Sequence, residues 1–346
     1  MDEIRLVGVD IGKFVFQIHC QDSKGNTVIR KRMSRTQFLD YFASAEPCCI
    51  AMEACAGSHF LARRLKEFGH LPRLIAPQFV RPFLKSSKSD MNDAEAICEA
   101  AARPSMRFVS AKSEAQQVLC ALQRVRQSLV MERCRTASQA HAFLLEFGFA
   151  FSRGARLWSS LAEAMKQHKL PQDISPLLEG LASQYNMKTT EIGVIEREML
   201  SRLRKEEAGR RLLTIPGIGM VTACALLCEL GDGQQFSNGR QFAASIGLTP
   251  RQHSTGGNTR LLGITKRGDK HVRTLLILCA HLIIARPSRG GDVLGDWARA
   301  LAMRRHPSVA ACALANHLAR IAWALVVRHT EYEPRTFERG SKHCHA

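Results

Sequence analysis

The stretch that decides the fold of the N-terminal part runs from residue 4 to residue 30 and reads IRLVGVDIGKFVFQIHCQDSKGNTVIR. Its apolar runs at 4–9 and 14–18 are joined near Gly12, and a turn at Gly25 and Asn26 leads into a third run. Short apolar runs separated by turn residues are typical of a strand meander. The sequence therefore predicts three strands at its start.

Strands and helices alternate after this meander. The expected elements are a helix at 36–42, a strand at 48–54 (CCIAMEA), a helix at 59–68, a strand at 71–77 (LPRLIAP) and a helix after Pro77. A meander followed by such alternation indicates an α/β domain. We assign residues 1–110 to this first domain.

Four acidic residues occupy positions that an α/β domain can bring together. Asp10 follows the apolar run LVGV, and Glu53 follows CCIAM. Asp90 and Asp93 are three apart at the start of an expected helix, which puts them on one face. Cleavage of a phosphodiester by two divalent ions requires several hard oxygen ligands. We therefore predict a site for two Mg²⁺ ions, with Mn²⁺ as the alternative ion, on Asp10, Glu53, Asp90 and Asp93.

Each of these acids also has a purely structural interpretation. A carboxylate at such positions can end a strand, carry surface charge or cap a helix N-terminus.

Residues 111–207 are expected to form long helices. The first starts near Ser113, and its packing seam has spacings of four, three and four at Val118, Leu122, Val125 and Leu129. The second runs from about Leu177 to Glu207, after a connecting segment at 149–176 that holds a shorter helix. The spacing fits an antiparallel hairpin, a coiled coil between subunits or an ordinary bundle within one chain.

The last third, residues 208–335, is expected to be mostly helical and opens with a glycine-rich turn between apolar helices, Pro216-Gly217-Ile218-Gly219. This pattern is typical of a helix-hairpin-helix, in which Gly217 and Gly219 let backbone N–H groups approach a phosphate. A plain helical hairpin capped by glycine is the alternative. Residues 336–346 are assigned to a tail.

The polar segment RQHSTGGNTR places Ser254 before Thr255 and two glycines. A serine hydroxyl attacks phosphorus only if its proton is removed and the developing charge is stabilised, and cations and glycine N–H groups meet the second need. We predict Ser254 as a nucleophile. The acidic site and its metals could remove its proton if the two domains come together, and His253 is a weaker candidate base; a turn that binds phosphate without covalent chemistry is the alternative. The expected nucleic-acid contacts of this region are Arg251, Gly256, Gly257, Arg260, Lys266, Arg267, Lys270 and Arg273.

The chain of 346 residues carries a net charge of +18. Such a charge attracts polyanions and releases their counterions, so nucleic acid is the expected partner. We find no export signal and no apolar run approaching roughly 18 residues, and we therefore expect a cytoplasmic protein without a membrane partner. Its 12 cysteines contain no C-x-x-C pair, which favours reduced core thiols.

Five motifs follow one another along the chain: VGVDIGK, AMEACAG, KSDMNDAEAI, IPGIG and GLTPRQHSTGGNTRLLGITKRGDKHVRTLL. In this order they resemble the DEDD-type transposases of the IS110 insertion-sequence family, which includes the Piv-related DNA invertases. The resemblance covers residues 4–330. Many members have a second serine where this chain has Thr255.

The resemblance implies a RuvC-like, ribonuclease-H-type N-terminal domain whose metal-binding tetrad falls on the four acids above. It implies a C-terminal transposase domain in which Ser254 forms a covalent link to DNA during transposition. It further implies a structured guide, a bridge RNA from the element's non-coding end, so that the protein itself reads mainly shape and backbone. The long helices would then assemble dimers and a tetrameric complex on DNA.

Three other functions fit parts of the sequence. A RuvC-like nuclease would use water as its nucleophile and keep Ser254 only as a phosphate contact. A non-enzymatic protein would bind DNA through the helix-hairpin-helix alone. An actin-like sugar kinase shares a VGVDIGK-like first phosphate loop, but such kinases need a second glycine-rich loop and an adenosine motif, and we find neither.

Overall fold

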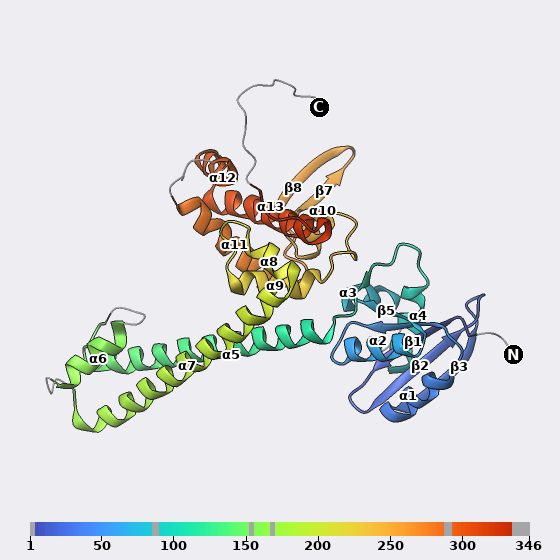
Figure 1. The fold of residues 1–346 in the computed structure, drawn as a ribbon, viewed down its shortest axis with the longest axis horizontal. Coiled ribbons are helices and arrows are strands. Elements are labelled where there is room, and N and C mark those ends of the chain that lie inside the picture. The colour runs from blue at the N-terminus through green and yellow to red at the C-terminus, as the bar shows by residue number, and fades with distance from the viewer. Residues whose placement is uncertain (1–3, 85–89, 152–155, 167–169, 287–292, 334–346) are drawn as a thin grey trace, which may run out of the picture. The chain divides into compact units, whose positions relative to one another are not determined.

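The computed structural model describes residues 4–84, 90–151, 156–166, 170–286 and 293–333 (Figure 1). The chain divides into two compact units, Met1–Ala115 and Gln116–Ala346. This division, after Ala115, lies close to the boundary that we expected near residue 110. The predicted tail at 336–346 lies outside the described residues.

A six-stranded sheet forms the centre of the first unit. Its elements are β1 (Leu6–Ile11), β2 (Val15–Gln21), β3 (Thr27–Ser34), α1 (Arg35–Ser44), β4 (Cys49–Glu53), α2 (Ser58–Glu67), β5 (Leu71–Ile75), α3 (Pro77–Val80), η1 (Arg81–Phe83), α4 (Asp90–Ala101) and β6 (Phe108–Val109). The strand order is β3-β2-β1-β4-β5-β6. The first three strands form an antiparallel meander, β4 and β5 run parallel to β1, and β6 is antiparallel to β5. The α/β prediction is confirmed, and β6 is an addition to it.

The two faces of this sheet are covered by different helices. Alternate side chains of a strand point to opposite faces. Val7 and Val9 of β1 pack in one core with Phe38 of α1 and Leu61 of α2. The other face lies against α4, whose Ile97 packs with apolar residues of β4 and β5. The sheet is therefore the middle layer of this unit.

Gly8 permits the close packing of α4 on β1. A Cβ atom at Gly8 would lie 2.3 Å from the carbonyl oxygen of Ala94 and 2.9 Å from the backbone nitrogen of Cys98. Both atoms belong to the helix backbone, which cannot move aside as a flexible side chain can. Glycine is therefore the residue that lets this helix contact the strand directly.

We expect Gly8→Ala to lower the free energy of unfolding by about 1–3 kcal/mol, because the added methyl group overpacks the contact with α4. Thermal or urea unfolding of the full chain measures the change. The matched control is Gly193→Ala, where a Cβ has open space; within a helix it should be neutral or stabilise by up to about 1 kcal/mol. Equal stability of Gly8→Ala and the wild type would contradict the close-packing argument.

The second unit is mostly helical, as predicted. Its elements are α5 (Glu114–Glu146), α6 (Arg156–Lys166), η2 (Gln172–Ile174), α7 (Ser175–Lys205), α8 (Glu207–Leu213), α9 (Met220–Leu230), α10 (Gly239–Ser245), β7 (Pro250–Thr255), β8 (Asn258–Ile264), α11 (Lys270–Ala285), α12 (Val293–Arg304) and α13 (Pro307–Arg328). The strands β7 and β8 form a separate two-stranded ribbon.

The long helices α5 and α7 pair within the chain. Arg126 forms a 2.7 Å ion pair with Glu196, and Arg133 lies over the ring of Tyr185. Arg133 follows Arg126 on α5, whereas Tyr185 precedes Glu196 on α7, so the two helices run antiparallel. Of the three arrangements that the sequence left open, the hairpin within one chain is the one observed.

The predicted packing seam on α5 was only partly right, because Leu122 packs against the core of this unit whereas Val118 and Val125 do not. Leu119 and Gln123 are buried, whereas Val118 and Val125 are 41% and 51% exposed. The spacing was correct, but an apolar spacing does not say which face of a helix meets the core when neighbouring faces also carry apolar residues. The seam of Val118 and Val125 therefore faces away from the packed core of the described chain.

Helix α13 is long and apolar enough to cross a membrane, with a mean hydropathy of 1.5 over its most apolar window. The expectation that no apolar run approaches the length of a membrane span was therefore wrong. Half of that window is buried inside the unit, and Leu314, Leu318 and Ala322 are fully buried. Length and composition of this kind are shared by the core helices of folded domains, and its packing assigns α13 to the core.

Candidate active site

Asp10 and Glu53 lie side by side at one end of the sheet. β1 and β4 run parallel, and their register ends with Val9 opposite Met52. Asp10 and Glu53 are the next residues on each strand, and Glu53 ends β4. The parallel pairing thus brings two carboxylates to one edge, as the sequence predicted from their positions at strand ends.

The electrostatic surroundings of Cys55 support this arrangement. Burial raises the pKa of its thiol, and the negative charges of Glu53 and Asp10 raise it further. A charge affects a neighbouring pKa only at short range, so one thiol senses both carboxylates. Sequence reasoning missed Cys55 as a neighbour of the site; its position two residues after the acid that ends β4 was the available signal.

The two aspartates of α4 come from the helix that lies over β1. Asp93 precedes Ala94, whose carbonyl oxygen covers Gly8, and Gly8 is on the same face of β1 as Asp10. The thiol of Cys98, one turn later, contacts the Leu6 carbonyl. The helix therefore runs from the level of Asp10 toward Leu6, and its first turn lies at the acidic end of the strand.

The donor atoms at this edge suit a divalent cation, because carboxylate oxygens are the hard ligands that Mg²⁺ and Mn²⁺ take. Among the side chains that the structure describes, no three of His, Cys, Asp and Glu form a metal-binding group. The side chain of Asp90 lies outside that described part. Asp10 and Glu53 are brought together, and the full tetrad stays a prediction.

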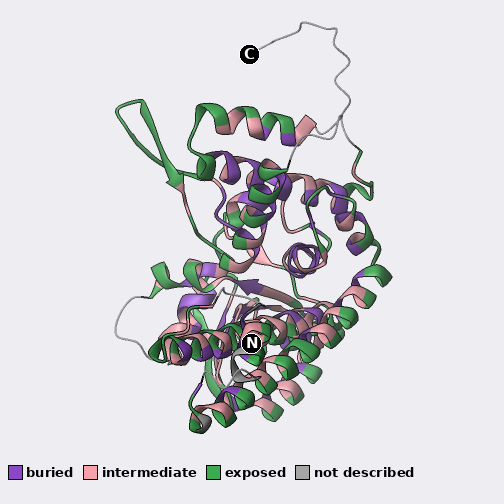
Figure 2. Ribbon diagram, turned by 90° about the vertical axis from the view of Figure 1, so that its left-hand side faces the viewer, coloured by how far each residue is buried: buried purple, intermediate pink, exposed green. Residues whose placement is uncertain are grey.

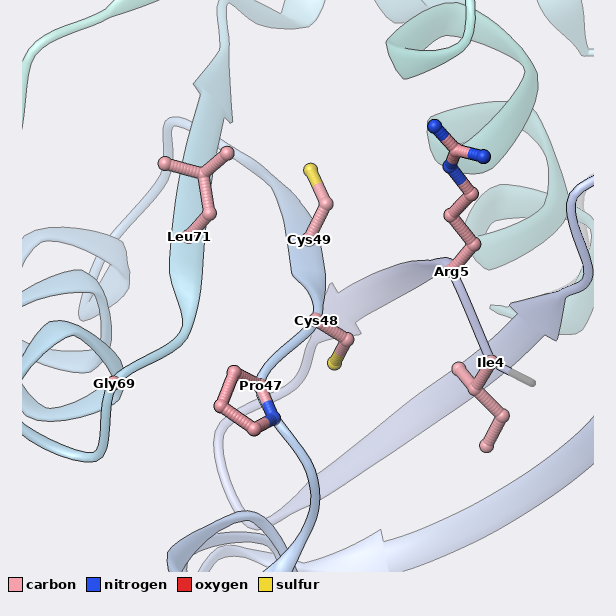
Figure 3. Close-up of a pocket in the computed structure, with 7 residues that line it drawn as sticks. All are labelled: Ile4, Arg5, Pro47, Cys48, Cys49, Gly69 and Leu71. Carbon is pink, nitrogen blue, oxygen red and sulfur yellow. The ribbon is translucent and has the colours of Figure 1, made fainter.

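A shallow pocket lies at the other end of the same strands (Figure 3). It is lined by Ile4, Arg5, Pro47, Cys48, Cys49, Gly69 and Leu71. Cys49 and Leu71 begin β4 and β5, whereas Glu53 ends β4. The pocket is therefore not part of the acidic site. Burial raises the pKa of Cys48 to about 11. The described cysteines are free thiols, but Cys134 is exposed, so the expectation of core thiols holds only for part of them.

Ser254 lies on an exposed ribbon. All six residues of β7 and all but the last of β8 are exposed (Figure 2). Gly256 and Gly257 connect the strands with φ angles of 56° and 81°. Two consecutive positive φ angles are those of a type I′ turn, which matches the twist of a hairpin. The predicted polar turn is thus the tip of a projecting hairpin.

The hairpin register separates the polar residues into two faces. Ser254 pairs with Thr259, and the side chain of Gln252 donates to its Oγ at 2.7 Å. His253 pairs with Arg260, and Thr255 pairs with Asn258. Because neighbouring residues on a strand point to opposite faces, His253, Arg260 and Thr255 all lie on the face away from Ser254. The geometry of the ribbon argues against His253 as the base for Ser254.

Two tight backbone contacts fix the base of the ribbon. A Cβ at Gly247 would lie 2.3 Å from the Arg267 carbonyl oxygen, and one at Gly268 would lie 1.7 Å from the Ser245 carbonyl oxygen. Both glycines also have positive φ angles. The two segments therefore cross at van der Waals contact, and the ribbon rises from a tightly packed base.

Arg273 belongs to this base and not to the exposed surface. It is only 8% exposed, and its Nη1 donates at 2.8 Å to the carbonyl oxygens of Ile246 and Arg267. A guanidinium used in this way cannot at the same time reach a phosphate. The predicted nucleic-acid contact of Arg273 is corrected to a structural role; Arg251, Arg260, Lys266, Arg267 and Lys270 are exposed.

We expect Arg273→Ala to lower the free energy of unfolding by about 3 kcal/mol, because it leaves two inward-facing carbonyls without a donor. The exposed Arg267→Ala makes the same change of residue type and should stay within about 0.5 kcal/mol of the wild type. Denaturant unfolding of the two variants compares them. Similar stabilities would show that Arg273 does not hold the ribbon base.

The glycine-rich turn between α8 and α9 has the predicted form, and its two glycines differ. A Cβ at Gly217 would lie 2.7 Å from the side chain of Ile283, and its φ angle is 80°. Gly219 caps α9 without a side-chain hydrogen bond, and a Cβ there would meet nothing within 4 Å. Turn geometry and packing explain Gly217, whereas Gly219 offers an open approach to the helix N-terminus.

Comparison with known proteins identifies the family. A model of a DEDD-type transposase domain matches residues 7–149, and a model described as "Transposase IS116/IS110/IS902 family" matches residues 209–292. The chain is 49% identical to the transposase for insertion sequence element IS1328 of Yersinia enterocolitica, over 96% of this chain and 99% of the relative. It is 38% identical to the transposase for IS1111A of Coxiella burnetii, over 96% and 92%.

A more distant likeness joins this chain to a DNA invertase. The pilin gene-inverting protein of Moraxella bovis is 37% identical over 73 residues, which are 21% of this chain and 23% of that protein. The match to the DEDD-type model identifies the mixed sheet as that of a ribonuclease-H-like DEDD domain. The chain belongs to the IS110 family of transposases, enzymes of the DEDD type that cleave and transfer DNA strands.

Proposed function

We propose that this transposase moves an insertion sequence with one composite site, made of the carboxylates of the first unit and Ser254 of the second. The observation that carries the proposal is the pairing of Asp10 with Glu53 at one sheet edge, together with a serine on an exposed ribbon that has a tightly packed base. The proposal requires the two parts to meet on DNA, within one chain or across two.

In this proposal Asp10, Glu53, Asp90 and Asp93 hold two divalent ions, Mg²⁺ with Mn²⁺ as the alternative. When bound, such ions stabilise the negative charge that develops on a phosphate during strand cleavage. By holding the positively charged ions in place, the carboxylates would position the scissile phosphate. In the assembled site they would also accept the proton of Ser254, since His253 faces away from Ser254.

Ser254 is the proposed nucleophile. Its Oγ forms a bond to the scissile phosphorus, its proton passes to a carboxylate, and the bond from phosphorus to one deoxyribose oxygen breaks. That oxygen leaves as a hydroxyl after taking up a proton. A free hydroxyl of another strand then attacks the serine phosphodiester, which rejoins the DNA and restores the serine. Gln252, which donates to the Ser254 oxygen, orients the hydroxyl before attack.

The exposed cations near the ribbon are the proposed contacts to the DNA backbone. Arg251 and Arg260 lie on the ribbon, and Lys266, Arg267 and Lys270 lie at its base. Gly256 and Gly257 expose the backbone at the tip. At the helix hairpin, Gly219 admits a phosphate to the start of α9, and Gly217 shapes the turn. Such contacts hold DNA without reading its sequence.

Sequence choice then falls to the proposed bridge RNA, and assembly to the long helices. Val118 and Val125 of α5, and Met187 and Val194 of α7, are apolar pairs seven residues apart that are 41–56% exposed. A repeat of seven on an exposed helix face favours pairing with a second copy. We propose a dimer, and a tetramer on DNA, in the cytoplasm where bacterial DNA lies.

The test is excision and insertion in cells that carry the element's ends and its flanking non-coding segment. The wild type should give both products, and Asp10→Ala should give neither. Deletion of the non-coding segment should abolish insertion if a guide RNA is needed. Normal insertion without that segment would remove the RNA from the proposal; normal insertion by Asp10→Ala would remove the carboxylates.

A further inference from the structure

A row of polar side chains crosses the sheet at the end where Asp10 lies. The register places Asp10 opposite Gln17 of β2, and Gln17 opposite Arg32 of β3. Side chains of directly opposite residues point to the same face of a sheet, about 5 Å apart. Arg32 therefore lies on the face of the carboxylates, two strands away and roughly 10 Å along the sheet.

Strand β3 carries three successive cations, and the structure gives each a different environment. Arg30 forms a 2.6 Å ion pair with Glu95 of α4. Lys31 points to the other face, where its Nζ lies 5.5 Å from the ring centre of Tyr41. The side chain of Arg32 points to the same face as Asp10 and is exposed to solvent. Arg30 and Lys31 therefore each have a structural contact with a helix, Arg30 with α4 and Lys31 with α1.

We propose that Arg32 is a positioning residue that binds a backbone phosphate next to the scissile one. The DNA strand that is cut at the carboxylates would continue across the sheet edge along Asp10, Gln17 and Arg32. A guanidinium binds phosphate oxygens in a bidentate manner and keeps its charge at every working pH. A cation on the same face would hold the strand beside the phosphate that is bound at the carboxylates. The inference rests on the proposed function.

An exposed cation on an edge strand has another known role. β3 is the edge of the sheet, and charged residues there prevent pairing with another chain. That role makes a different prediction: loss of Arg32 would promote association of the protein and leave its interaction with DNA unchanged. The two roles are separable by experiment.

The first experiment measures strand cleavage of DNA carrying the ends of this element, with its flanking RNA and Mg²⁺. Arg32→Gln should raise KM about tenfold with a smaller change in kcat, and Arg32→Lys should recover part of the loss. The slope of log KM against log salt should fall by about one, as expected for one lost phosphate contact. The control is Lys31→Gln, which removes one adjacent charge from the opposite face and should keep the wild-type KM.

The second experiment replaces single phosphates near the cut with uncharged methylphosphonates and measures binding by fluorescence anisotropy. At one position the change should weaken the wild type about tenfold and have no further effect on Arg32→Gln, because both changes remove the same contact. Additive losses at every position, or an unchanged KM and salt slope in Arg32→Gln, would overturn this inference and leave the proposed function standing. A wild type that does not cleave would overturn the proposed function and this inference together.

Discussion

Asp10→Asn should reduce DNA strand cleavage by about a thousandfold or more. The amide has the shape of the carboxylate but lacks its charge, so it weakens the binding of divalent ions that supply several kcal/mol of transition-state stabilisation. Each 1.36 kcal/mol corresponds to about a factor of ten in rate. Single-turnover cleavage of end DNA, at saturating protein, measures the effect.

The matched control for this variant is Asp40→Asn. Asp40 is an exposed aspartate on α1, so the same chemical change there should leave the rate within about twofold, as for surface substitutions of about 0.5 kcal/mol or less. A cleavage rate in Asp10→Asn near that of the wild type would show that this carboxylate is not at the catalytic centre.

Ser254→Ala should abolish the covalent protein–DNA intermediate and stop strand transfer. The variant lacks the oxygen that would bond to phosphorus, and the next hydroxyl along the chain, that of Thr255, lies on the opposite face of the ribbon. Thr255→Val, which removes that second hydroxyl, should therefore keep the adduct. Denaturing gels of end DNA incubated with each variant give the comparison.

The alternative of a water-using nuclease predicts the opposite pattern for the serine. In that case Ser254→Ala would cut DNA at a normal rate, and no adduct would survive denaturation of the wild type. Loss of the adduct in Thr255→Val with retention in Ser254→Ala would place the reactive hydroxyl one residue later.

The acidic edge was predictable because a parallel sheet gathers its strand ends. Asp10 and Glu53 each follow an apolar run, and the pairing of β1 with β4 converts that sequence feature into proximity. The row from Asp10 to Arg32 was not predictable. It depends on the register of two antiparallel pairs, and a shift by one residue would have sent Arg32 to the other face.

The C-terminal unit shows where local patterns are insufficient. The polar flanks of Gly256 and Gly257 gave no apolar alternation, so a hairpin was read as a turn. Arg273 looked like its basic neighbours, and only the folded chain shows the carbonyls of Ile246 and Arg267 around its guanidinium. The burial of Arg273 depends on how distant segments pack together, and it cannot be predicted from the composition of a basic segment.

The measurement that tests the composite site most directly is identification of the residue joined to DNA. Wild-type protein incubated with end DNA, the flanking RNA and Mg²⁺ would be denatured and digested with protease and nuclease, and the nucleotide-bearing peptide would be sequenced by mass spectrometry. The account predicts a phosphodiester on Ser254 that does not form with Asp10→Asn. A phosphodiester on another residue, or its formation at a normal level in Asp10→Asn, would contradict it.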